Sequence, residues 1–181
     1  MLTDLQTRKF TRMFHMFDVD GNGFVEEVDY LQAVQNLKEL YGVAEDSDEY
    51  HQLYQGQMGI WQFVCGIADK DLDNRVTLNE FLEGYDFFIQ DEEAMNSLLM
   101  GMTETMLTLS DTNGDGKLDV SGYIGNLVAF NISEDEARET FNRLDRDQDG
   151  YLTRDELTQA VKEFFTSNEP DSPGNWLLGA Y

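Results

Sequence analysis

Basic residues and cysteine are both scarce in this chain of 181 residues. Twelve Lys and Arg stand against 36 Asp and Glu, so the formal net charge is −24 at pH 7. A field of this sign repels nucleic acid and anionic membrane surfaces, and it favours divalent cations as partners. The single cysteine, Cys65, has no second thiol in the chain with which to form a disulfide.

Long apolar runs are lacking as well. No stretch approaches the roughly 20 apolar residues that a membrane-spanning helix needs. The first residues, Met1 to Arg8, do not contain the apolar region of a secretory signal peptide. We therefore expect a cytoplasmic protein without a membrane span, and we expect it to be a monomer.

Side chains that could act as nucleophile or base at neutral pH are few. They are His15, His51 and Cys65, which lie in separate helical patterns with no catalytic motif around them. Cys65 continues an apolar helical pattern and is expected to be a core residue. The sequence therefore does not predict an enzyme.

Apolar residues, in contrast, make up 41% of the chain and include 12 Phe, 8 Tyr and 2 Trp. This content can bury one sizeable core or two fused small ones, which excludes a disordered acidic tail. The apolar residues recur at helical spacing before and after four acidic loops. These loops start at Asp18, Asp69, Asp111 and Asp145.

The loop from Asp145 to Glu156 spaces its oxygen-bearing side chains around Gly150. In a calcium loop, positions one, three and five supply oxygens, position six allows a sharp turn, position seven offers its backbone carbonyl, and position twelve offers a bidentate carboxylate. The loop matches every one of these positions. The expected ligands are Asp145, Asp147, Asp149, the carbonyl of Tyr151, and Glu156.

The first loop is complete except that position twelve is Asp29 instead of Glu. The shorter side chain reaches the ion less easily with both oxygens, which favours six ligands over seven and makes Mg²⁺ a better competitor. We therefore expect Mg²⁺ binding at this site. The expected ligands are Asp18, Asp20, Asn22, the carbonyl of Phe24, and Asp29.

The second loop has Asn74 where the pattern requires glycine. Asn tolerates a left-handed backbone better than other residues with a side chain, so we expect a competent site with mild strain. The expected ligands are Asp69, Asp71, Asp73, the carbonyl of Arg75, and Glu80.

The third loop has an intact first half but ends in Gly122. The missing carboxylate removes up to two oxygen ligands, and the glycine weakens the helix that follows. We therefore expect a weak or empty site. Its remaining candidate ligands are Asp111, Asn113, Asp115, the carbonyl of Lys117, and Asp119.

The four loops make the chain a fourfold repeat of helix, loop and helix. Each has an apolar residue at position eight, which can form a short antiparallel contact with a neighbouring loop and so pair the first with the second and the third with the fourth. We predict an all-α fold of eight helices in two compact, fused, paired lobes. The predicted divisions are residues 1–90, residues 91–166, and a tail of residues 167–181.

With four such helix–loop–helix units, the whole chain resembles EF-hand proteins of the sarcoplasmic calcium-binding type. A first loop that ends in Asp29 is similar to that of calerythrins and sarcoplasmic proteins, and the ending from Phe165 to Gly179 resembles the tail of calexcitins. The resemblance implies a compact cytosolic protein that binds calcium, with magnesium at some sites, as a buffer or signalling protein. We expect a buffer that holds about three ions.

Two other functions stay open. A calcium sensor would expose a Met-rich groove to an unidentified protein target, whereas a buffer would use the same methionines as core. A luciferin-type protein would hold an apolar ligand between the lobes, but few suitable polar residues are present beyond His15. The methionines concerned are Met95, Met100, Met102 and Met106.

The ending after the last helix contains both prolines of the chain, Pro170 and Pro173, followed by Trp176, Leu177 and Leu178. Prolines and a glycine suit a turn that reverses the chain, and the three apolar residues are too hydrophobic to remain in water. We expect the tail to fold back over the apolar surface between the lobes.

Overall fold

The computed structural model describes residues 1–111 and 114–181, which form eight α-helices and four short strands. The elements of the first half are α1 (Asp4–Phe17), β1 (Phe24–Val25), α2 (Glu27–Tyr41), α3 (Asp48–Ala68), β2 (Val76–Thr77) and α4 (Leu78–Phe88). Those of the second half are α5 (Glu92–Ser110), β3 (Lys117–Asp119), α6 (Val120–Val128), α7 (Glu134–Leu144), β4 (Tyr151–Thr153) and α8 (Arg154–Thr166).

Short capping motifs fix several helix starts. Capping boxes are present at Thr3, Thr77 and Thr153, where the hydroxyl accepts the amide hydrogen of the residue three positions on. Thr77 and Thr153 stand at position nine of their loops, and the side chains that return to them are those of Glu80 and Glu156. In both loops, the candidate metal ligand at position twelve therefore also completes the capping box that starts the following helix.

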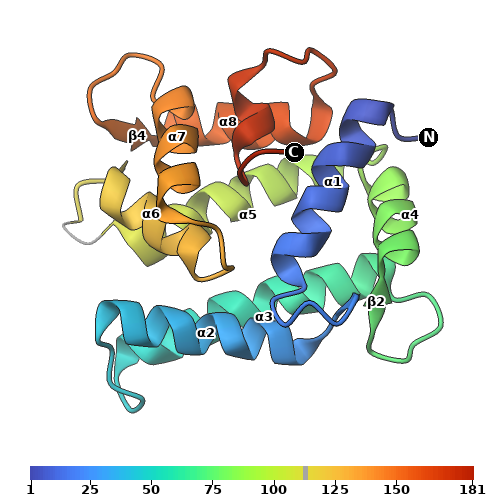
Figure 1. Cartoon of the computed structure of the whole chain (residues 1–181), viewed down its shortest axis with the longest axis horizontal. Helices are drawn as coiled ribbons and strands as arrows, with labels where there is room; N and C mark the ends of the chain where they lie inside the picture. The colour runs from blue at the N-terminus through green and yellow to red at the C-terminus, as the bar shows by residue number, and fades with distance from the viewer. Residues whose placement is uncertain (112–113) are drawn as a thin grey trace.

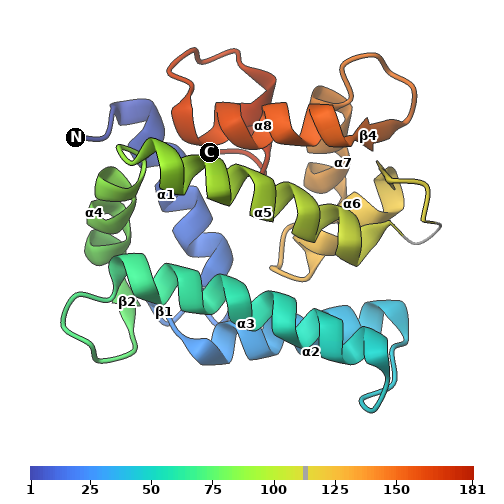
Figure 2. The same cartoon turned by 180° about the vertical axis from the view of Figure 1, so that it is seen from behind.

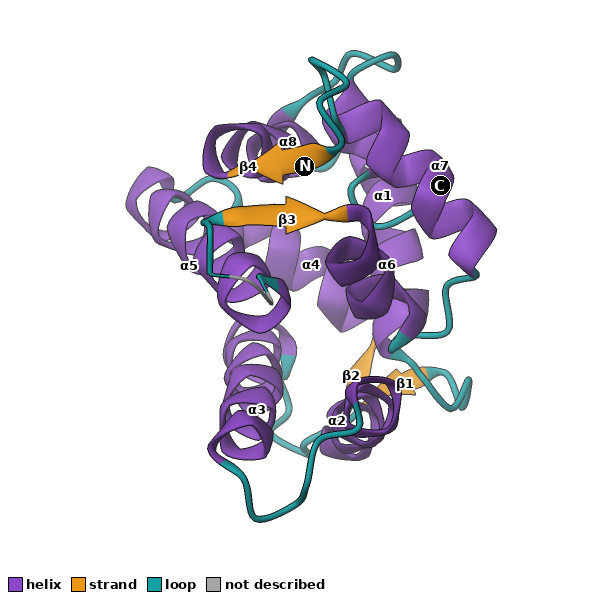
Figure 3. Ribbon diagram, turned by 90° about the vertical axis from the view of Figure 1, so that its left-hand side faces the viewer, coloured by secondary structure: helices purple, strands orange, loops and turns teal. Residues whose placement is uncertain are grey.

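The strands join the loops in the predicted pairs. β1 lies antiparallel to β2 with Val25 opposite Val76, and β3 lies antiparallel to β4 with Leu118 opposite Leu152. All four of these side chains are fully buried. Figure 3 shows the two strand pairs, each at the meeting point of two loops. The predicted pairing is confirmed.

The helices form two layers joined by α1. Helices α2 and α3 pack together on one side, α5 to α8 form the other, and α1 crosses between them beside α4 (Figures 1 and 2). The ring of Phe10 in α1 lies 5.4 Å from Tyr85 of α4 and 5.7 Å from Phe165 of α8. The predicted all-α fold of four helix–loop–helix units is confirmed. Among the described residues, none of the helices has the length and apolar content required to cross a bilayer.

The tail returns along the second half of the molecule. A short 3₁₀ helix, η1 (Pro173–Trp176), packs on α7 and α8, and the hydroxyl of Tyr123 donates to the carbonyl of Leu177 at 2.6 Å. Leu177 and Leu178 are buried, but Trp176 is only partly buried. Its indole lies 3.9 Å from the guanidinium of Arg143, a cation–π contact made at the surface. The divisions at residues 90 and 166 stay a prediction.

Candidate metal centre

The first and sixth positions of each loop are joined in the same way. One carboxylate oxygen at position one accepts the amide hydrogen at position six, whose backbone has a positive φ in every loop. Asn74 takes this conformation with a φ of 63°, as expected. The oxygen–nitrogen distances are 3.0 Å for Asp18 and Gly23, 3.1 Å for Asp69 and Asn74, 2.7 Å for Asp111 and Gly116, and 2.9 Å for Asp145 and Gly150.

The hydrogen bonding of the second carboxylate oxygen at position one differs between the loops. Oδ1 of Asp18 and Oδ1 of Asp69 are buried and have no hydrogen-bond partner among the described residues. A buried carboxylate oxygen without a partner is costly unless a cation faces it. The donors around it are hard oxygens, which suit Ca²⁺ or Mg²⁺. The first two loops therefore fit a divalent cation.

Three loops bring carboxylates together as the ligand spacing predicts. In each group, one carboxylate oxygen per residue lies within 4.8 Å of the others. Glu80 and Asp149 are not part of these groups. The residues expected to offer carbonyls, Phe24, Arg75 and Tyr151, stand at or just before the start of a strand. The groups are Asp18, Asp20 and Asp29; Asp69, Asp71 and Asp73; and Asp145, Asp147 and Glu156.

Asp29 is the most deeply buried of these carboxylates. Its Oδ1 accepts the backbone N–H groups of Val19 at 2.9 Å and Asp20 at 3.3 Å, and its Oδ2 accepts that of Glu26 at 2.8 Å. Burial raises the pKa of Asp29, although the hydrogen bonds from Glu26 and Asp20 act in the opposite direction. Asp29 is therefore tied into the loop by backbone hydrogen bonds to both of its oxygens, and no ion pair to it is found in the part of the chain that the structure describes.

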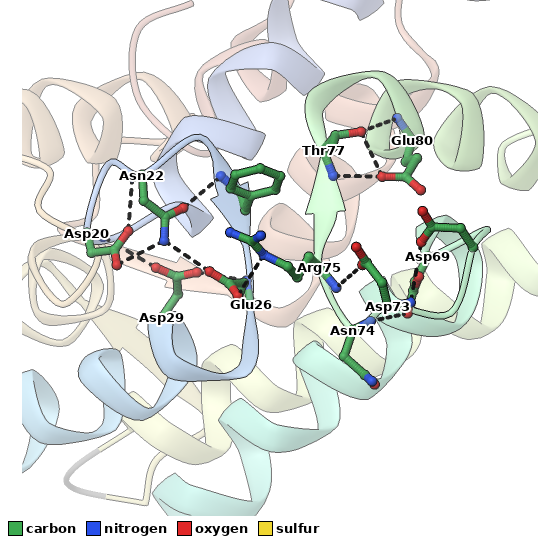
Figure 4. A network of polar contacts seen from close by, with 12 residues as sticks. Asp20, Asn22, Glu26, Asp29, Asp69, Asp73, Asn74, Arg75, Thr77 and Glu80 are labelled. Atoms are coloured by element: carbon green, nitrogen blue, oxygen red, sulfur yellow. Dashed lines mark hydrogen bonds and ion pairs between the residues drawn. The ribbon is translucent and has the colours of Figure 1, made fainter.

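One carboxylate of the first loop does not follow from the calcium-loop pattern of the sequence. Glu26, at position nine, accepts a hydrogen bond from the side-chain amide of Asn22 at 3.0 Å. It also forms an ion pair with Nε of Arg75 at 3.1 Å. The guanidinium of Arg75 also lies 3.7 Å from the ring centroid of Phe24. Figure 4 shows Arg75 reaching across the strand pair to Glu26. The first two loops are thus joined by side chains as well as by strands.

The glutamates at position twelve have a different environment from Asp29. Thr77 donates to Glu80 through its amide at 2.9 Å and its hydroxyl at 2.7 Å, and these bonds lower the pKa of Glu80. Burial raises the pKa of Glu156, but hydrogen bonds from Thr153 and Arg146 outweigh it and the pKa lies below its usual value. Both side chains are held in the charged form that a metal ligand requires.

The third loop engages both oxygens of its first carboxylate, as does the fourth, where Oδ1 of Asp145 accepts the amide hydrogen of Asp149 at 3.2 Å and Oδ2 accepts that of Gly150. Oδ1 of Asp111 accepts the backbone N–H groups of Gly114 at 2.8 Å and Asp115 at 3.2 Å, while Oδ2 is bonded to Gly116. Both oxygens are therefore engaged by the loop itself. No group of three metal-binding side chains lies in this loop as far as the structure describes it. The candidate ligand Asn113 lies outside the described residues.

The remaining candidate ligands of the third loop also have other roles. The side chain of Asp119 caps α6 by accepting the amide hydrogen of Gly122 at 2.8 Å. Nζ of Lys117 forms an ion pair with Asp149 of the fourth loop at 3.2 Å. The cap at Asp119 engages a candidate ligand and supports only weak metal binding in the third loop, whereas the ion pair of Lys117 places a cation beside the carboxylates of the fourth.

Position four is a second strained point of the loops, which their ligand pattern does not indicate. All four loops have a positive φ there, and in the second loop the residue is Leu72, with φ of 61° and 81% exposure. A left-handed backbone destabilises the folded state by about 1–2 kcal/mol at a residue with a side chain. Glycine avoids this strain but loses more conformational entropy on folding, which costs roughly 0.5–1 kcal/mol. We expect Leu72→Gly to raise the free energy of unfolding by about 0.5–1 kcal/mol.

Urea denaturation in excess EDTA measures this change without metal binding. The matched control is Gly21→Leu, which places a side chain at the same position of the first loop, where φ is 71°. It is expected to destabilise the protein. If the two substitutions changed the free energy of unfolding equally, the backbone at Leu72 would not be strained.

Comparisons with known proteins agree with this arrangement. The family model of the EF-hand domain pair matches residues 7–86 and 104–162. Calerythrin of Saccharopolyspora erythraea is 28% identical over 166 residues, which cover 91% of this chain and 94% of that protein. Among solved structures, a calcium-binding protein of Streptomyces coelicolor, described in terms of calcium-mediated regulation, is 33% identical with a TM-score of 0.74, covering 91% of this chain and 99% of the other.

A second similar structure extends the likeness in fold. The coelenterazine-binding protein of Renilla muelleri has a TM-score of 0.79 at 21% identity, covering 99% of this chain and 100% of the other. The chain belongs to the EF-hand family. The resemblance to the calerythrin, calexcitin and sarcoplasmic calcium-binding type is also confirmed.

Proposed function

We propose that this protein is a calcium buffer with three working sites, in the first, second and fourth loops. The observation that carries the proposal is the set of three carboxylate groups, each beginning with a position-one Asp that is held by its own loop. A bound Ca²⁺ or Mg²⁺ would supply the positive charge that these groups lack. Asp73, Asn22, Asp149, Glu80 and the carbonyls at position seven would complete the ligand sets.

Metal binding would also stabilise the fold. Three divalent ions would change the formal net charge from −24 to −18. The reduced repulsion, and the linkage between binding and folding, both favour the native state. The proposal places the protein in the cytoplasm as a monomer, where its acidic surface would meet mainly cations.

The placement of the methionines favours a buffer over a sensor. Met95 is buried, and Met102 and Met106 are partly buried against the main core. Of the four methionines that a sensor would use for its groove, Met100 is the one with a largely exposed side chain, at 74%. A sensor would have to disrupt this packing to offer a surface to a protein target. An unidentified protein target stays as the alternative.

Calorimetric titration with calcium tests the number of sites. We expect three ions to bind, because the third loop has Gly122 in place of a carboxylate at position twelve and no group of three metal-binding side chains lies in its described part. Four sites of equal affinity would contradict the proposal. The variant Glu156→Gln is expected to remove one of the three sites and leave the others measurable.

Repeating the titration in millimolar magnesium shows at which sites magnesium competes with calcium. We expect magnesium to weaken calcium binding most at the first site, because the short side chain of Asp29 favours the smaller ion. Asp29→Glu should remove that difference. If magnesium competes equally well before and after the substitution, side-chain length does not determine the selectivity.

A further inference from the structure

A cavity of about 650 Å³ lies between the two layers of helices. Its inner wall is formed by α1, α4 and the tail, through buried residues that include Met13, Tyr85, Phe88 and Leu178. The outer wall is formed by α3 and α5, which run one above the other on the side seen in Figure 2. The cavity is separate from the metal-binding loops and is not used by the proposed buffer function.

The lining of the cavity contains no charged side chain among the described residues. It consists largely of Met, Phe, Leu and Ile, with a few uncharged polar groups. Because the protein as a whole carries a net charge of −24, an anionic ligand would find no cation in the cavity and would be repelled on approach. These features favour a neutral, apolar ligand.

One polar group in the wall has an unmet hydrogen-bonding capacity. Gln57 of α3 is only 3% exposed, and its Oε1 is buried without a hydrogen-bond partner among the described residues. A buried carbonyl oxygen without a donor is destabilising, and such groups are rare in native proteins. A ligand with a hydroxyl or N–H group would satisfy it.

The mouth of the cavity is lined by glycines on facing helices. A Cβ atom built on Gly59 of α3 or Gly101 of α5 would meet no other atom within 4 Å. Glycine within a helix costs about 1 kcal/mol relative to alanine, and these two do not relieve any close contact. Their effect is to leave the entrance between α3 and α5 free of side chains.

The size of the cavity sets the kind of occupant. Pockets of 300–1,000 Å³ suit small molecules, whereas a docked helix would need a groove about 10–12 Å wide along its length. Met13, Met16, Met102 and Met106 all line the cavity, and methionine adapts its shape to different ligands. We propose that this cavity binds a neutral, mainly apolar small molecule that donates a hydrogen bond to Oε1 of Gln57.

Fluorescence titration with N-phenyl-1-naphthylamine tests the proposal. This probe is neutral and has one N–H donor. Its 8-sulfonated analogue differs by one negative charge, and its N-methyl analogue lacks the donor. In excess EDTA or in excess calcium, we expect one equivalent of the neutral probe to bind at least roughly tenfold more tightly than the sulfonated one. No binding in either condition, or equal binding of the two, would overturn the proposal.

Two variants locate the bound probe. Gly59→Phe places a ring in the mouth and is expected to abolish binding, whereas Gly66→Phe on the same helix, also exposed and open but outside the lining, should leave it unchanged. Calcium stoichiometry, measured in parallel, shows whether the variants keep the fold. Undiminished binding to Gly59→Phe, with calcium binding intact, would show that the probe lies elsewhere and reject the cavity.

Gln57→Leu tests the hydrogen bond. We expect it to weaken binding of N-phenyl-1-naphthylamine roughly two- to tenfold and to leave the N-methyl analogue unaffected. A comparison of the two probes in the same variant cancels any change in cavity shape. Equal effects on both probes would reject Gln57 as the acceptor.

Discussion

Deleting residues 170–181 is expected to lower the free energy of unfolding by up to about 3–6 kcal/mol, since two buried leucines contribute at most roughly 1.5–3 kcal/mol each. These are Leu177 and Leu178, which join the main core across α7 and α8. The entropy of ordering the tail reduces this figure. The loss should nevertheless be a large part of the total stability of the domain.

The deletion also removes a partner from a buried charge. Lys9 of α1 is fully buried, and its ammonium group donates to the carbonyls of Glu163 at 3.3 Å and Ser167 at 3.1 Å and to Oδ1 of Asn175 at 2.8 Å. Burial lowers the pKa of Lys9 to about 8, although the nearby Glu163 carboxylate acts in the opposite direction. Without Asn175, the ammonium would lose its closest acceptor.

Urea denaturation of the truncated protein in EDTA measures the loss. A point variant gives a milder form of the same test, because a Cβ on Gly174 would lie 2.5 Å from the carbonyl oxygen of Ala160 and 2.5 Å from Cβ of Glu163. Gly174→Val should therefore lift the tail from α8. Asp171→Val, at an exposed position of the same turn, is the control and should change stability little. Unchanged stability on truncation would show that the tail does not hold the core.

The loops could be predicted because each one is local in sequence. Twelve consecutive residues contain the ligands, the turn at Asn74 or its glycine equivalents, and the capping box that starts the next helix. The strand pairing followed from one apolar residue per loop, such as Val25 opposite Val76. Local chemistry of this kind needs no knowledge of how distant segments pack.

Features that depend on distant segments could not be predicted. The burial of Lys9 requires acceptors from the end of α8 and from the tail, more than 150 residues away. The cavity and its buried Gln57 arise from the spacing of α3 and α5, for which no sequence pattern exists. The contact between Arg75 and Glu26 had one usable signal, an acidic residue at position nine of the first loop opposite a basic one at position seven of the second.

Glu163→Gln is expected to lower the free energy of unfolding at pH 7 by about 1.5–3 kcal/mol, the range for hydrogen bonds to a charged group. The Glu163 carboxylate accepts from Ser172 at 2.7 Å, from the amide of Gly174 at 2.9 Å and from Gln159 at 2.7 Å. A guanidinium nitrogen of Arg146 contacts both of its oxygens, at 2.7 and 2.8 Å. One side chain thus joins the fourth loop, α8 and the tail.

The pH dependence gives this prediction a second readout. Burial raises the pKa of Glu163, but hydrogen bonds from Gln159, Ser172, Gly174 and Arg146 outweigh it and lower the pKa to about 2. Because the folded state holds the proton less tightly than the unfolded chain, the contribution of Glu163 is complete above about pH 4.5 and is lost as the pH falls towards 2. The stability difference between wild type and Glu163→Gln should shrink across that window.

Urea denaturation between pH 7 and pH 2, in EDTA, compares the two proteins. Glu139→Gln is a suitable control, because Glu139 forms an exposed ion pair with Arg143 at 2.7 Å, and such pairs contribute less than about 0.5 kcal/mol. The control should therefore follow the wild type over the whole range. A stability difference for Glu163→Gln that stays constant down to pH 2 would show that the charge of the carboxylate does not hold the tail.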